Sequence, residues 1–143
     1  MGRNLTLKKN IKIKASIADV WKTITNPKLL KITIFGCDVI TDWNVGSQIL
    51  FKGSWEGEEF IDKGTIRDFQ EGKSYEYDYW SNFSGLPDSS ENYSIIKFQL
   101  DESNNGTTLS LEQNNFATQT MYEHSDKNWD VSLRSVKELV EKK

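Results

Sequence analysis

The side chains that could act as nucleophiles, general bases or metal ligands are few and far apart in this chain. His124 is its only histidine and Cys37 its only cysteine. A general base needs a second group to orient it, and a protein metal site usually needs three or four nitrogen, sulfur or carboxylate ligands. Because neither residue has such partners nearby in the sequence, we expect no catalytic residue, no bound metal and no cofactor.

Cys37 follows a glycine, and no basic residue stands beside it to lower the pKa of its thiol. We therefore expect a small buried apolar side chain rather than a reactive thiolate. Four acidic residues also gather in one short stretch: Glu56, Glu58, Glu59 and Asp62. They could supply a pair of carboxylates for acid–base chemistry, but the turn residues around them favour a charged hairpin tip that faces water.

Aromatic side chains give a stronger indication of a site. They make up 12% of the chain, and Tyr75, Tyr77 and Tyr79 alternate along one predicted strand. Phe51 and Trp55 share a face of another strand. In a curved sheet one such face would be turned toward a covering helix, and apolar walls with a few hydroxyl groups suit a small-molecule pocket. The alternative is that these rings simply fill the core.

The elements that would position these residues are indicated by periodicity and by capping residues. A strand over residues 5–15 alternates apolar and polar side chains, with a break at Lys9 that predicts a bend or bulge. Ser16 stands in a capping-box pattern and predicts the start of a helix. A proline at a first helical position then predicts a second, short helix over residues 27–31.

From residue 37 to residue 116, turn residues recur at short intervals between segments that alternate apolar and polar side chains. This pattern predicts a meander of about six strands, which with the first strand makes a curved seven-stranded antiparallel sheet. Thr120 and Glu123 form a capping box that predicts the start of a long C-terminal helix. Its apolar stripe would lie across the sheet: Trp129, Leu133, Val136 and Val140. The predicted fold class is therefore α+β.

Length and composition narrow the class of protein. A chain of 143 residues suits a single domain, 1–143, and a net charge of −3 without a basic patch argues against nucleic acid as a partner. The first residues lack the apolar segment of a secretory signal, and no run of about 18 apolar residues predicts a membrane span. One cysteine permits no internal disulfide, which fits a reducing compartment. We therefore expect a cytoplasmic protein.

Short motifs, in order along the chain, carry a family resemblance: IKASIADVWKTITNPKLL (13–30), WNVGS (43–47), GTIRDF (64–69), NNGTTLSLEQNNF (104–116) and a tryptophan in the last helix. The matching residues are Val20, Trp21, Pro27, Gly46, Gly64, Gly106, Thr107, Phe116 and Trp129. In this order and spacing the chain resembles the helix-grip fold of the START-like or Bet v 1-like superfamily. Within it, the chain is similar to domains of the activator-of-Hsp90-ATPase type.

The resemblance implies a cavity between the curved sheet and the C-terminal helix that binds a hydrophobic or aromatic small molecule without catalysing a reaction. We expect the following side chains to line it: Phe51, Trp55, Tyr77, Tyr79, Phe98, Trp129 and Leu133. The loop over residues 81–92 and the short helix over residues 27–31 would form its mouth.

Two other functions stay open. The resemblance also implies a module that presents its sheet or its first helices to a chaperone such as Hsp90. It further allows a cavity-based enzyme of the cyclase or hydrolase kind, which would need an inward carboxylate, or His124, with a perturbed pKa. Asp62, Glu76 and Asp78 are the acidic residues to inspect first for that role.

Overall fold

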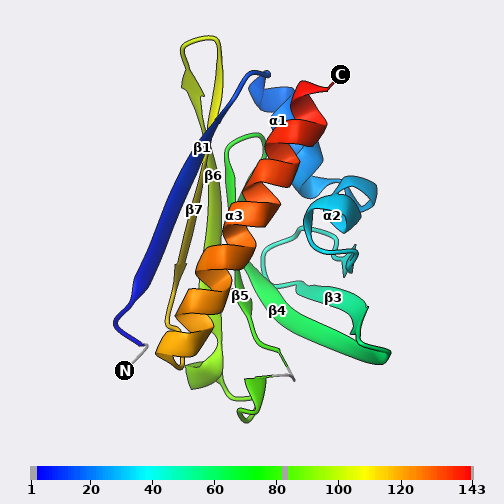
Figure 1. Ribbon diagram of the computed structural model, residues 1–143, viewed down its shortest axis with the longest axis vertical. Coiled ribbons are helices and arrows are strands. Elements are labelled where there is room, and N and C mark those ends of the chain that lie inside the picture. Colours follow the sequence, from blue (N-terminus) through cyan, green and yellow to red (C-terminus); the bar gives the residue numbers. More distant parts are fainter. Residues whose placement is uncertain (1–2, 82–83, 143) are drawn as a thin grey trace.

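The computed structural model describes residues 3–81 and 84–142, and for Trp55 the backbone alone. Within this part of the chain, a seven-stranded sheet curves around one long helix (Figure 1). Neighbouring strands are antiparallel, in the order β1-β7-β6-β5-β4-β3-β2. This arrangement confirms the predicted α+β helix-grip fold with two short helices after the first strand.

The strands are β1 (Thr6–Ile13), β2 (Asp38–Ile40), β3 (Gln48–Trp55), β4 (Glu58–Gln70), β5 (Ser74–Tyr79), β6 (Ser94–Ser103) and β7 (Gly106–Asn114). The helices are α1 (Ile17–Thr25), α2 (Pro27–Thr33) and α3 (Gln119–Glu141), with a short 3-10 turn η2 (Ser90–Asn92) before β6. Figure 1 shows α3 running diagonally across the sheet, while the β3–β4 hairpin projects away from β1. Among the described residues, no helix is both long and apolar enough to cross a membrane.

The short helices begin as the capping residues predict. The Ser16 side chain accepts a hydrogen bond from the Asp19 backbone N–H at 3.2 Å, and α1 follows. The Asn26 side chain accepts from the Lys28 N–H at 2.9 Å, with proline at the first helical position of α2. That helix continues to Thr33, two residues beyond the predicted end.

The start of α3 differs from the predicted capping box. Thr118, and not Thr120, is the N-cap: its side chain accepts a hydrogen bond from the Met121 N–H at 3.1 Å. Two threonines two residues apart offer alternative caps, and Thr118 is the one with the extended backbone that a cap requires. The predicted apolar stripe is present, because Leu133, Val136 and Val140 are buried.

Lys9 does not mark a bulge. The pairing of β1 with β7 runs in unbroken register past it, so the predicted irregularity is absent there. The side chain is instead turned toward α3, where its ammonium lies 2.5 Å from Asp126 and 2.7 Å from Asp130. A lysine can take an inward position because its long stem packs while its charge is paired at the edge of the layer. A register shift does occur in β4, between Ile66 and Asp68.

The contact between the helices and the sheet is densely filled on the side where α1 packs. Tyr75 of β5 is 2% exposed, and its hydroxyl donates to the Ile24 carbonyl of α1 at 2.7 Å. Its ring lies 5.8 Å from that of Trp21 and 5.2 Å from that of Phe98, measured between centroids. This region is therefore core, and any space between the layers must lie farther along the sheet.

Candidate ligand-binding cavity

A cavity of about 560 Å³ lies between α3 and the sheet, on the side of the β3–β4 hairpin. The segment between α2 and β2 contributes one edge, strands β3 to β7 contribute the wall, and α3 covers it. The lining combines several aromatic rings with a few polar groups. Its members are Ile34, Phe35, Cys37, Phe51, Ser54, Phe60, Asp62, Tyr77, Tyr79, Ile96, Gln113, Ser125, Asn128, Trp129 and Ser132.

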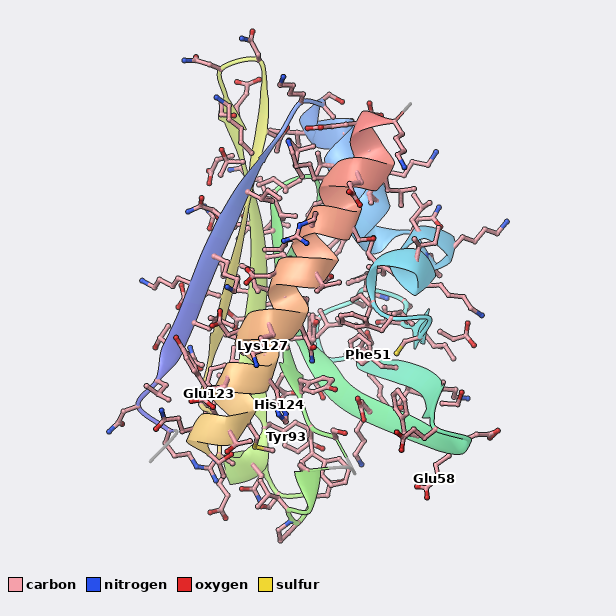
Figure 2. The ribbon with its side chains drawn as sticks, viewed as in Figure 1. Phe51, Glu58, Tyr93, Glu123, His124 and Lys127 are labelled. Carbon is pink, nitrogen blue, oxygen red and sulfur yellow. The ribbon has the colours of Figure 1, made fainter. Side chains whose placement is uncertain are left out.

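The aromatic wall is a set of rings in mutual contact. Phe51 of β3 lies 5.6 Å from Tyr77 and 5.6 Å from Tyr79, both on β5. These separations are typical of favourable tilted and edge-to-face ring pairs. Figure 2 places Phe51 in the space between α3 and the β3–β4 hairpin. The wall is therefore preformed, because the rings hold one another in place.

Four of the residues expected to line a cavity do so: Phe51, Tyr77, Tyr79 and Trp129. Phe98 does not reach it, but packs edge to face against Trp129 at 5.5 Å between centroids. Leu133 is buried in the core and is not part of the lining. The side chain of Trp55 falls outside the described residues.

The two segments expected to form the mouth of the cavity contribute no described residue to its lining. The lining includes Ile34 and Phe35, which follow α2, and includes no residue of 27–31. Phe35 and Gly36 both have positive φ angles, 49° and 80°, and the chain turns there before it enters β2. Phe35 is 58% exposed although its side chain borders the cavity. In the described part of the 81–92 loop, no residue belongs to the lining.

Asp62 is the charged residue of the lining. It is 7% exposed, and its Oδ2 accepts a hydrogen bond from the Tyr79 hydroxyl. Oδ1 has no hydrogen-bond partner among the described residues. Burial raises the pKa of the Asp62 carboxyl above its usual range, although hydrogen bonds from Ser81 and Tyr79 oppose this. The carboxyl of this cavity-lining residue thus has one buried oxygen without a partner among the described residues.

The buried position of Asp62 corrects the prediction that four acidic residues form a water-facing tip. Glu56, Glu58 and Glu59 are exposed at the β3–β4 turn, and Figure 2 shows Glu58 at the far end of that hairpin. Asp62 lies farther along β4, where it alternates with outward residues and shares the inner face with Phe60. That alternation was visible in the sequence and could have identified it.

A hydrogen-bond chain fixes the indole of α3 above the sheet. The Trp129 Nε1–H donates to Gln113 Oε1 at 2.7 Å. Gln113 Nε2 in turn donates to the Ser94 Oγ at 3.0 Å, joining β7 to β6. Gln113 and Ser94 are both buried, so each bond satisfies a polar group that water does not reach. The chain therefore holds Trp129 in one orientation over the cavity.

The other candidates for chemistry do not form a reactive pair. Cys37 is buried, and burial together with nearby Asp62 and Asp38 raises the pKa of its thiol to about 11. It is therefore a neutral thiol near pH 7, in agreement with its expected role as a small buried side chain. His124 is exposed near the start of α3 and is outside the lining (Figure 2).

The two other acidic residues singled out for inspection do not enter the cavity. Asp78 accepts a hydrogen bond from the Thr65 N–H at 2.7 Å, and Glu76 pairs with Arg67 at 3.2 Å. Within residues 3–81 and 84–142, no group of three or more histidine, cysteine, aspartate or glutamate side chains could hold a metal ion. The cavity can enclose an apolar small molecule and form a few hydrogen bonds with it.

A curved antiparallel sheet that grips a long C-terminal helix and leaves an aromatic cavity beneath it defines a helix-grip domain of the START-like type. The sequence of residues 14–141 matches the family described as Activator of Hsp90 ATPase homolog 1-like protein. Because the match spans most of the chain, the protein belongs to that family. This confirms the resemblance seen in the sequence motifs.

Solved structures agree with this placement. The solution structure of ChR145 from Cytophaga hutchinsonii is 36% identical, with 99% of this chain and 97% of that chain covered and a TM-score of 0.83. CV1439 from Chromobacterium violaceum is 21% identical over 95% of this chain and 96% of that one, with a TM-score of 0.78. The Aha1 dimer from Colwellia psychrerythraea is 22% identical over 95% and 96%, at 0.73, and like CV1439 it supports the fold alone. A comparison with curated protein sequences found no match.

Proposed function

We propose that this protein binds a hydrophobic or aromatic small molecule in the cavity between α3 and the sheet, without catalysing a reaction on it. The observation that supports the proposal is the cavity itself, about 560 Å³ in volume, with aromatic walls from two layers and a few polar groups. Small-molecule pockets commonly enclose about 300–1,000 Å³ and have this mixture of groups. The family's helix-grip fold adds support, because its curved sheet and long helix leave the cavity between them.

The experiment is a thermal-shift screen on the wild type and on a pair of variants of α3. A ligand present at 100 times its dissociation constant adds about 2.7 kcal/mol to the free energy of unfolding. Ser132→Phe places a ring in the cavity, because Ser132 is buried and part of the lining. Val131→Phe is the matched control, because Val131 is the residue before Ser132 and its side chain is 51% exposed.

We expect ligands that raise the midpoint of the wild type to raise that of Val131→Phe equally and to lose their effect on Ser132→Phe. Two results would contradict the proposal. One is a broad set of apolar compounds that leaves the wild-type midpoint unchanged. The other is an equal shift in all three proteins, because such ligands would bind elsewhere.

An enzymatic function is a second candidate, and one observation favours it. The Asp62 carboxyl borders the cavity with a raised pKa, a property of general acids and bases. The described lining offers it no activated nucleophile, because the Cys37 thiol is neutral near pH 7. Mass spectrometry of a bound ligand after prolonged incubation separates the two functions. If the wild type converts the ligand and Asp62→Asn does not, the protein is an enzyme and the binding proposal is wrong.

Binding to a chaperone such as Hsp90, which the family name suggests, stays a prediction. Co-purification with Hsp90 would test it. Since that contact would use the outer surface, Ser132→Phe should leave it unchanged while abolishing ligand binding. The two functions can therefore be told apart with one variant.

A further inference from the structure

The described lining of the cavity carries a negative charge and no positive charge. Among the described residues of the lining, Asp62 is the acidic one, and there is no lysine, arginine or histidine. The nearest basic residue along β4, Lys63, pairs with Asp88 at 2.5 Å and lies over the Trp80 ring at 5.7 Å. Lys127 of α3 is exposed (Figure 2). An anionic group that entered the cavity would meet a carboxylate and no compensating cation.

The Asp62 carboxylate can accept a further hydrogen bond from a ligand. Tyr79 and Ser81 both hydrogen-bond to the carboxyl, the Tyr79 hydroxyl to Oδ2, while Oδ1 is buried and has no partner among the described residues. A buried carboxylate without full hydrogen bonding is costly, and the cost is recovered when a ligand supplies the missing donor. A charged donor is the stronger partner, because charge-assisted hydrogen bonds are roughly twice as strong as neutral ones.

The rings beside Asp62 also favour a cation. Tyr79, which holds the carboxyl, lies edge to face with Phe51 at 5.6 Å, and Tyr77 lies against the same ring. The face of an aromatic ring attracts an ammonium group that comes within about 6 Å of its centre. Carboxylate and rings therefore act on the same kind of group at the same place in the cavity.

Resting on the function proposed above, we infer that the cavity selects ligands that carry a protonated amine on an aromatic body, with the ammonium hydrogen-bonded to the Asp62 carboxylate. The aromatic body occupies the space between Phe51, Tyr77 and Trp129. Neutral analogues bind more weakly because they leave the charge of Asp62 unpaired. Carboxylic acids, including fatty acids and aromatic acids, are the weakest class.

The test uses three probes with one ring system and different end groups: tryptamine, tryptophol and indole-3-propionic acid. Isothermal titration calorimetry near pH 7 gives their dissociation constants, and amide chemical shifts show whether the cavity is the site. We expect tryptamine to bind about tenfold or more tightly than tryptophol, in line with one charge-assisted hydrogen bond, and indole-3-propionic acid to bind most weakly.

Asp62→Asn should abolish the preference for the amine. The asparagine can still accept from Tyr79, but it turns an amide NH₂ toward the cavity in place of an acceptor. Tryptamine affinity should fall about tenfold, while tryptophol affinity changes little. Asp78→Asn is the matched control, because it removes the same charge from a residue that bonds the Thr65 N–H outside the cavity. Asp62→Ser serves if Asp62→Asn does not fold.

The outcomes separate the two proposals. Equal affinity for the three probes, or an amine preference that survives in Asp62→Asn, overturns the inference and leaves cavity binding in place. An equal loss in Asp78→Asn also overturns it, because the effect would then be one of net charge. If no probe binds and no other apolar compound shifts the midpoint, the proposed function fails, and the inference fails with it.

Discussion

Replacing Asp62 with asparagine should make the protein more stable at neutral pH. The wild-type carboxyl is 7% exposed, lacks a partner for Oδ1 and has no basic residue beside it in the cavity lining. Asparagine keeps the size of the side chain and an oxygen that can accept from Tyr79. The substitution therefore removes a charge from a place that disfavours it and changes little else.

The expected magnitude comes from the cost of one incompletely satisfied buried group, about 1–3 kcal/mol. Asp62→Asn should recover about 1 kcal/mol or more of that at pH 7, which corresponds to a rise in the unfolding midpoint of several degrees. The gain should be limited, because the cavity wall still presents a polar amide. Because asparagine and aspartate are about the same size, the substitution does not disturb the packing around the cavity.

The pH dependence follows from the raised pKa of the Asp62 carboxyl in the folded protein. A carboxyl group with an unfolded pKa of about 3.9 and a raised folded value stabilises the fold fully below pH 3.9, and that contribution is lost as the pH rises through the folded value. The advantage of Asp62→Asn should therefore be largest near pH 7 and fade toward pH 4. The facing groups, the Cys37 thiol and the Tyr79 hydroxyl, stay neutral throughout, because burial raises both pKa values.

Urea unfolding of both proteins between pH 7 and about pH 3 measures this difference directly. Asp42→Asn is a control of opposite sign, because hydrogen bonds from Ser47 and Asn44 lower the pKa of the Asp42 carboxyl. Its stabilisation is present above the unfolded pKa, so this variant should lose stability at neutral pH and approach the wild type in acid. An Asp62→Asn protein that is less stable than the wild type at pH 7, or a difference that does not vary with pH, would refute the reasoning.

Three further changes test other parts of the structure. Gly64→Ala should destabilise the protein by about 3 kcal/mol or more in urea unfolding, because its Cβ would lie 1.7 Å from the Asp78 carbonyl oxygen. Trp129→Phe should cost about 1–3 kcal/mol in the same assay, because it removes the donor to the buried Gln113 Oε1 while retaining a ring. The Cys37 thiol, with a pKa of about 11, should react with iodoacetamide at pH 8 much more slowly than in the urea-unfolded chain.

Each of these has its own control. Gly72→Ala has open space around its Cβ but a φ of +77°, so it should cost only about 1 kcal/mol of backbone strain, and an equal loss at both glycines would contradict the steric argument. Trp129→Phe combined with Gln113→Met should cost less than the sum of the single changes, and strict additivity would contradict a bond between them. Rapid alkylation of the folded protein would contradict the buried, neutral thiol.

Most of the fold could be predicted from the sequence because its signals are local. The cap at Ser16 and the alternation along β5 each depend on a few adjacent residues, and both are present in the structure. Lys9 shows the limit of the same reasoning. Its place in β1 looked like a defect, and only the tertiary contact with Asp126 and Asp130 of α3 explains it.

The cavity was harder to predict because its shape depends on how the layers meet. The aromatic rings of β3 and β5 could be found from alternation along their strands, but the sequence does not show that Phe98 lies behind Trp129. Ile34 and Phe35 border the cavity only because the chain turns with positive φ after α2. The glutamates that precede Asp62 indicate a water-facing hairpin tip, whereas the alternation along β4 places Asp62 itself on the inner face.

The most direct test of the central claim is an NMR measurement of intermolecular nuclear Overhauser contacts between tryptamine and the isotopically labelled protein. The account predicts contacts from the indole ring of the ligand to Phe51, Tyr77 and Trp129, and from its aminoethyl protons to the neighbourhood of Asp62. Contacts confined to exposed apolar side chains such as Ile32 and Val45, or no contacts at saturating ligand, would contradict it.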